Sequence, residues 1–164
     1  SMARPTLLTV VKELSTSSQR VWVTGHSLGG ALAHLAAAAL AKAEVEVFGV
    51  YTFGAPPCGD AEFAEGYNAT LQQVTHRLVN NIDNVPLWFE DTMVHVGQLR
   101  YIARDGKTVL DGTDRTAAEA IISDQSQSLA MDSENVDIQG LPFKINQDHS
   151  IKAYYEACKA AVTD

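Results

Sequence analysis

The sequence predicts an α/β protein with a mostly parallel sheet flanked by helices, and three observations support this fold class. Residues 21–23 form an apolar run typical of a strand buried on both faces, and the alanine-rich stretch at 31–43 is typical of a helix. A second strand is expected at 45–53, and the order strand, helix, strand indicates a parallel pair. Asp105-Gly106 is a strong hairpin signal, which adds an antiparallel strand at 108–110.

The other expected elements continue this alternation along the chain. Pro5 fits the first position of a helix whose apolar side chains share one face, and Asp60 and Ser150 fit the N-caps of two later helices. A polar stretch at 123–128 suits a surface excursion. These elements are a helix at 5–14, a short helix at 61–66, strands at 76–79 and 95–103, a helix at 117–122 and a last helix that follows Ser150.

The composition describes one ordinary globular domain. With 164 residues, of which 46% are hydrophobic and 20% charged, the chain can bury a sizeable core. Its formal net charge of -8 argues against a nucleic-acid surface, which needs clustered Lys and Arg. We expect no transmembrane segment, because the longest nearly apolar run, 31–41, is too short and contains His34. Cys58 and Cys158 lie far apart in the sequence, which favours free thiols over a disulfide framework. The sequence does not indicate the cellular compartment.

The segment Gly25-His26-Ser27-Leu28-Gly29 fits the pattern G-x-S-x-G. Flanked by a strand and a helix, this pattern is typical of a tight turn that holds a nucleophilic serine at its tip. The alternative is that Ser27 is only the N-cap of the helix and that the glycines close the turn. The nucleophile hypothesis makes a demand on the rest of the chain, because a serine hydroxyl is a poor nucleophile until a base takes its proton.

His149 is the best candidate for that base among five histidines, because it stands in a polar loop just before a helix. His26 adjoins Ser27 and is expected to point away from the serine side chain. The other histidines have ordinary structural interpretations, namely His34 in a helix and His76 and His95 in strand-like runs.

Asp83 is the best candidate for the acid that orients this base. It follows a strand in an Asn-rich turn, and ligands bind beyond the carboxyl ends of the strands in open α/β sheets. The chain order of Ser27, acid and His149 is that of α/β-hydrolases. Asp148 is the alternative acid, although adjacent side chains seldom face each other, and a turn or capping role is expected for it. No cofactor or metal is expected, because no zinc-ligand spacing and no phosphate-binding loop is present.

Five segments in order resemble the class 3 (fungal-type) triacylglycerol lipase family. The resemblance implies an α/β-hydrolase fold and a serine esterase or lipase that hydrolyses acylglycerols or related carboxylic esters. It implies Ser27 as nucleophile, Asp83 as acid and His149 as base, which agrees with the interpretation of the residues themselves. The segments are residues 23–33, residues 52–56 with 59–60, residues 80–86, residues 95–97, and residues 148–150 with Tyr154.

The resemblance is incomplete before the serine. Members of that family carry further strands, a lid helix and a loop with one oxyanion donor upstream, whereas 26 residues precede Ser27 here. We therefore expect a single domain over 1–164 that is truncated at its N-terminus and lacks the first strands of the full fold. The Leu28 amide is the expected oxyanion donor, and the second donor has no counterpart. An unpaired edge on the first strand suggests a homodimer or a second chain that completes the sheet.

The alternative function is a catalytically impaired lipase-like fragment or a non-catalytic lipase-like binding module.

Overall fold

The computed structural model describes residues 6–14, 19–89, 91–103, 109–111 and 147–162. Within these residues one sheet has the strand order β1-β2-β3-β4-β5, with the first four strands parallel and the last antiparallel to β4. The prediction of a mostly parallel sheet with one antiparallel strand is therefore confirmed. The strands are β1 (Val21–His26), β2 (Val47–Phe53), β3 (Thr75–Asn80), β4 (Gln98–Ile102) and β5 (Val109–Asp111).

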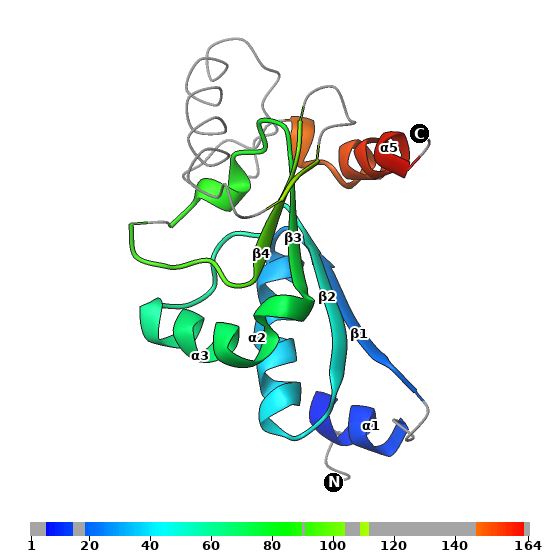
Figure 1. Cartoon of the computed structure of the whole chain (residues 1–164), viewed down its shortest axis with the longest axis vertical. Helices are drawn as coiled ribbons and strands as arrows, with labels where there is room; N and C mark the ends of the chain where they lie inside the picture. Colours follow the sequence, from blue (N-terminus) through cyan, green and yellow to red (C-terminus); the bar gives the residue numbers. More distant parts are fainter. Residues whose placement is uncertain (1–5, 15–18, 90, 104–108, 112–146, 163–164) are drawn as a thin grey trace, which may run out of the picture.

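Helices alternate with the parallel strands. The helix α2 connects β1 to β2, and α3 connects β2 to β3 (Figure 1). Because strands in sequential order are joined by right-handed crossovers, both helices lie on the same side of the sheet. The α-helices are α1 (Leu7–Leu14), α2 (Leu28–Lys42), α3 (Ala61–Leu71) and α5 (Ile151–Val162), and the 3₁₀-helices are η1 (Gln72–Val74), η2 (Val85–Leu87) and η4 (Gln147–His149).

The hydrophobic core lies between this side of the sheet and the helices α2 and α3. Small side chains on α2 let the helix approach the sheet closely, and Ala37 and Val50 are completely buried there. Leu8 and Val11 of α1 pack against the same core at its edge. The buried members of the core are Ala37, Leu40, Val47, Val50, Ala64, Tyr67, Leu71 and Val96.

The opposite side of the sheet is open at β1 and β2, which corrects one prediction. The run at 21–23 was expected to be buried on both faces, yet Trp22 is 54% exposed. Its ring contacts the half-exposed rings of Phe48 and Tyr51 on β2. In the part of the chain that the structure describes, α5 reaches this face only near the carboxyl ends of the strands, where Tyr154 contacts Phe53. The outer edge of β1 has no neighbouring strand among those residues, so completion of the sheet by a second chain stays a prediction.

Several element boundaries differ from the predicted ones. The fourth strand begins at Gln98 rather than at residue 95, because Gly97, with a φ of +70°, turns the chain just before it. The helix capped by Asp60 runs to Leu71, and the cap itself is confirmed by the bond from the Phe63 amide to Oδ1, 2.9 Å long. The Asp105-Gly106 turn, the helix at 117–122 and the stretch at 123–128 lie outside the described residues.

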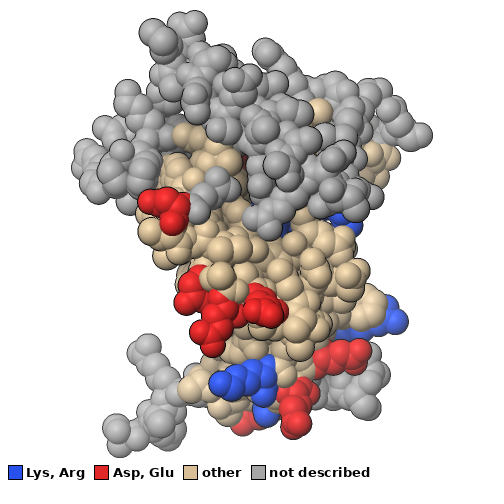
Figure 2. Space-filling view, turned by 60° about the vertical axis from the view of Figure 1, so that its left-hand side comes forward, with Lys and Arg blue, Asp and Glu red and all other residues tan. Residues whose placement is uncertain are grey.

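The described residues also show how acidic side chains, apolar helices and cysteines are distributed. Figure 2 shows acidic side chains gathered on the side of the molecule where α3 lies, and Asp60, Glu62 and Glu65 are exposed there. No helix in the described part is both long and apolar enough to cross a membrane. Cys58 and Cys158 are free thiols, and each is partly buried.

Candidate active site

A strained turn between β1 and α2 presents Ser27. The residue has a φ of 57° and a ψ of -132°, a backbone conformation that a residue with a side chain adopts only when its surroundings impose it. The Ser27 amide donates to the Phe53 carbonyl (2.9 Å), which joins the turn to β2. A Cβ atom on Gly25 would lie 2.1 Å from the Gly29 carbonyl oxygen, so only glycine fits there. The Ser27 side chain makes no capping bond to α2, which argues against a role as N-cap alone.

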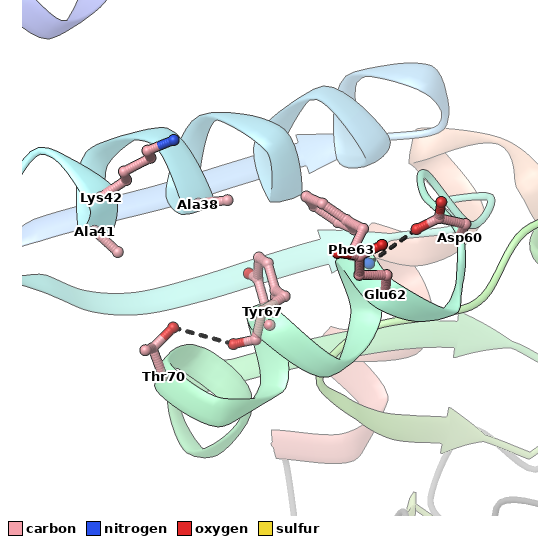
Figure 3. Close-up of a pocket in the computed structure, with 9 residues that line it drawn as sticks. Ala38, Ala41, Lys42, Asp60, Glu62, Phe63, Tyr67 and Thr70 are labelled. Carbon is pink, nitrogen blue, oxygen red and sulfur yellow. Dashed lines mark hydrogen bonds between the residues drawn. The ribbon is translucent and has the colours of Figure 1, made fainter.

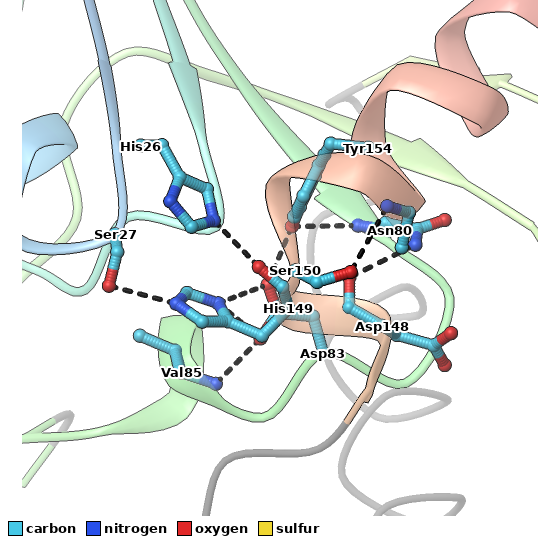
Figure 4. A network of polar contacts seen from close by, with 10 residues as sticks. His26, Ser27, Asn80, Asp83, Val85, Asp148, His149, Ser150 and Tyr154 are labelled. Atoms are coloured by element: carbon cyan, nitrogen blue, oxygen red, sulfur yellow. Dashed lines mark hydrogen bonds and ion pairs between the residues drawn. The ribbon is translucent and has the colours of Figure 1, made fainter. Parts of the chain in front are cut away.

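The structure brings Ser27, His149 and Asp83 into one hydrogen-bonded line (Figure 4). Ser27 Oγ lies 2.8 Å from His149 Nε2, and His149 Nδ1 lies 2.9 Å from Asp83 Oδ2 and 3.0 Å from Oδ1. Because a carboxylate only accepts, Nδ1 carries the proton and Nε2 is free to accept from the serine hydroxyl. Asp83 is 0% exposed and His149 is 4% exposed, so water competes little for these bonds.

Asp83 is held by three further contacts at the end of β3. Its amide donates to the Asn80 carbonyl (2.9 Å), and Oδ1 accepts from the Val85 amide (3.0 Å). The Tyr154 hydroxyl donates to Oδ2 at 2.7 Å and accepts from the Asn80 amide at 3.0 Å. Burial and the neighbouring Asp83 carboxylate raise the pKa of Tyr154 well above its ordinary value, so the hydroxyl keeps the proton that it donates.

Gly54, at the end of β2, leaves room for the acid and the base. Its φ is +58°, and a Cβ atom there would lie 2.4 Å from Asp83 Oδ2 and 2.8 Å from His149 Nδ1. A side chain at this position would therefore push the two groups apart. Neither Gly54 nor Tyr154 was predicted as a site residue, although both lie in segments that resemble the lipase family.

Asp148 does not contact the imidazole of its neighbour. Its carboxylate accepts from the Asn81 side chain (3.0 Å), and its backbone carbonyl accepts from the Asn80 side chain (3.1 Å). These two bonds join the segment that carries His149 to the turn after β3. The Asp148 carboxylate therefore has a structural role in this loop, and Asp83 is the acid that contacts the imidazole.

The other histidines lie in structural positions, with one exception. His34 is buried on α2, where Nε2 lies 3.2 Å from Thr52 Oγ1, and burial, together with the charge of Arg77, lowers the pKa of His34 to about 3. His95 Nε2 lies 2.7 Å from the Pro86 carbonyl, and the ring of His76 lies against that of Tyr51. His26 is the exception, because its Nε2 lies 2.6 Å from the backbone carbonyl of His149.

Comparisons with known proteins show which family this chain belongs to. Residues 2–93, more than half of the chain, match the family model described as Lipase (class 3). The chain belongs to the class 3 lipase family. The predicted family resemblance is therefore confirmed.

Individual relatives and structures agree with this class 3 lipase assignment. The lipase ZK262.3 of Caenorhabditis elegans is 42% identical over 79 residues, which are 44% of this chain and 22% of the relative. A lipase from Rhizopus microsporus var. chinensis is 33% identical with a TM-score of 0.57, over 63% of this chain and 38% of the fungal one. A solved triacylglycerol lipase, whose title states that a serine protease triad forms its catalytic centre, is 33% identical with a TM-score of 0.51, over 60% of this chain and 38% of its own. These similarities confirm the predicted α/β-hydrolase fold, and this chain spans well under half the length of each of the three.

The backbone amide of Leu28 follows Ser27 directly. It lies at the first position of α2, where an amide has no acceptor within the helix and points out of the helix start. Its role as an oxyanion donor stays a prediction. The described residues contain no group of three or more side chains that could hold a metal ion.

A groove between α2 and α3 is separate from these residues (Figure 3). It has a volume of about 630 Å³, and it contains none of the predicted site residues. Its lining residues are Ala38, Ala41, Lys42, Asp60, Glu62, Phe63, Gly66, Tyr67 and Thr70.

Proposed function

We propose that this chain is a serine hydrolase of carboxylic esters that forms an acyl-enzyme on Ser27, with acylglycerols or related esters as substrates. The observation that carries the proposal is the line of hydrogen bonds from Ser27 Oγ through His149 to the buried Asp83 carboxylate. The substrate class is supported by the class 3 lipase family and by the triacylglycerol lipase among the similar structures.

Each residue of the line has a defined part in this reaction. His149 Nε2 takes the hydroxyl proton of Ser27 while Oγ forms a bond to the ester carbonyl carbon. Asp83 stabilises the imidazolium that results and keeps its Nδ1 proton directed at the carboxylate. The Leu28 amide donates to the negative carbonyl oxygen. His149 then gives its proton to the departing alcohol, and water releases the acid from Ser27 by the same steps.

A fluorophosphonate probe tests this proposal, because it reacts with activated serines. We expect rapid labelling of the folded wild-type chain, none of the Ser27→Ala variant, and none of wild-type protein unfolded in urea. Release of p-nitrophenol from a p-nitrophenyl ester should be lost in the same variant. Absence of labelling in the folded wild type would refute the proposal and would favour the non-catalytic lipase-like binding module.

A further inference from the structure

His26 contacts the base residue from the strand that carries the nucleophile. It is the last residue of β1, and its Nε2 lies 2.6 Å from the backbone carbonyl of His149. A carbonyl only accepts, so Nε2 carries the proton and donates it. The two imidazole rings also lie against each other, with centroids 4.6 Å apart and an angle of 32° between their planes.

His26 and Ser27, which are consecutive in the sequence, therefore both bond to His149, but to different groups of it. The Ser27 hydroxyl bonds to the imidazole of His149 at 2.8 Å, and the His26 imidazole bonds to its main chain (Figure 4). The bond from His26 fixes the backbone of His149 to the end of β1, although 123 positions separate the two residues. The side-chain bond is then formed from a backbone whose position is already set.

The other backbone contact of this segment fixes it to a different strand. Asp148 is hydrogen-bonded to Asn80, the last residue of β3, and to Asn81, which follows it. Asp83 lies in the same turn after β3. The Asn contacts therefore set the base relative to the acid, whereas the His26 contact sets the base relative to the nucleophile. A displacement of about 1 Å between reacting groups can cost about a hundredfold in rate.

We propose that His26 is a positioning residue of the reaction proposed above, on which this inference rests. Its Nε2 proton is donated to the His149 carbonyl and keeps Nε2 of the base within hydrogen-bond distance of Ser27 Oγ. His26 takes no proton from the substrate or the serine in this role.

Two variants that differ by one methylene group separate the hydrogen bond from other effects. In His26→Gln the side-chain amide reaches about as far as the imidazole Nε2 and restores the donor, whereas in His26→Asn it is too short. We expect kcat and the rate of fluorophosphonate labelling to fall about 10- to 100-fold in His26→Asn, with KM within about twofold of wild type. His26→Gln should stay within about threefold of wild type. His26→Phe keeps a ring against His149 without a donor, so it should behave like His26→Asn.

His76→Phe is the matched control, since it removes a histidine of β3, which is separated from β1 by β2, and it should keep the wild-type rate. Thermal unfolding of each variant shows whether it folds. Equal rates in His26→Gln and His26→Asn, or a wild-type rate in His26→Phe, would overturn the inference.

A spectroscopic measurement separates this inference from the proposed function. Long-range ¹⁵N–¹H spectra of the histidine rings report which nitrogen of His149 carries the proton. We expect Nδ1 to carry the proton in every variant, because Asp83 accepts from it. The ¹⁵N shift of Nε2, which reports the bond from the Ser27 hydroxyl, should match the wild type in His26→Gln and change in His26→Asn. A wild-type chain with no activity but this pattern would refute only the proposed function, whereas an unchanged spectrum in His26→Asn would refute only the role of His26.

Discussion

The carboxyl end of the sheet and the core beneath α2 and α3 are built by different interactions. At the carboxyl end, polar side chains from β1, the turn after β3 and the segment before α5 are joined by hydrogen bonds across 66 or more positions of sequence. In the core, apolar side chains such as Leu40 and Val50 are buried almost completely and pack without polar partners. Substitutions in the first region should therefore change the rate more than the stability, and substitutions in the second should do the reverse.

Asp83→Asn is expected to have the largest effect and to act on the rate. The amide has nearly the same shape, but it can donate to Nδ1 of His149 and so favour the tautomer in which Nε2 carries the proton. Such a base cannot accept from Ser27, and we expect kcat/KM to fall about 10⁴-fold, equivalent to about 5 kcal/mol. Ester hydrolysis measures the rate, and urea unfolding shows whether the fold survives.

Asp148→Asn is the control for this substitution, because its carboxylate contacts Asn81 rather than the imidazole. We expect its rate to stay within about tenfold of wild type. A loss in Asp148→Asn as large as that in Asp83→Asn would mean that the two acids share the role.

Acid should lower the stability of the fold through His34, which is buried on α2. Since the pKa of His34 is lowered to about 3 in the folded chain from 6.5, the unfolded state binds more protons between these values. The free energy of unfolding should therefore fall as the pH is lowered from 6.5 to 3, by up to about 5 kcal/mol. Urea unfolding across this range checks the slope. His34→Gln keeps an amide near Thr52 but cannot be protonated, so its curve should be flatter, and parallel curves would contradict the assignment.

Leu40→Ala should reduce the stability and leave the chemistry unchanged. Leu40 is 2% exposed, and its truncation leaves a cavity that should cost about 2 to 5 kcal/mol in the free energy of unfolding. Leu35→Ala, on the same helix but 42% exposed, should cost less than about 1 kcal/mol. Fluorophosphonate labelling below the unfolding temperature should proceed at the wild-type rate in both variants. A slowed rate in folded Leu40→Ala would mean that the core and the site are coupled.

The difference between the two regions also explains which features could be predicted from the sequence. The turn at Ser27 follows from a local pattern of strand, glycines and helix. The positions of Asp83 after a strand and of His149 before a helix suggested them as its partners, and the chain order agreed. The contacts of Tyr154 and His26 could not be predicted, because they depend on how α5 lies against the ends of β1 and β3. Trp22 was placed wrongly for a related reason, since an apolar strand does not reveal what packs over each of its faces.

Tyr154→Phe should have the smallest effect, and it should lower both the stability and the rate, because this side chain lies between the two regions. The substitution removes the donor to Asp83 Oδ2 and leaves the Asn80 amide buried without its acceptor. We expect a loss of about 1 to 3 kcal/mol in the free energy of unfolding and, since Asp83 keeps its bond from the Val85 amide, only about a tenfold fall in kcat. Tyr155→Phe is the matched control, because Tyr155 is 63% exposed and should tolerate the loss of its hydroxyl. Equal effects in the two variants would mean that the bond to Asp83 does not orient the acid.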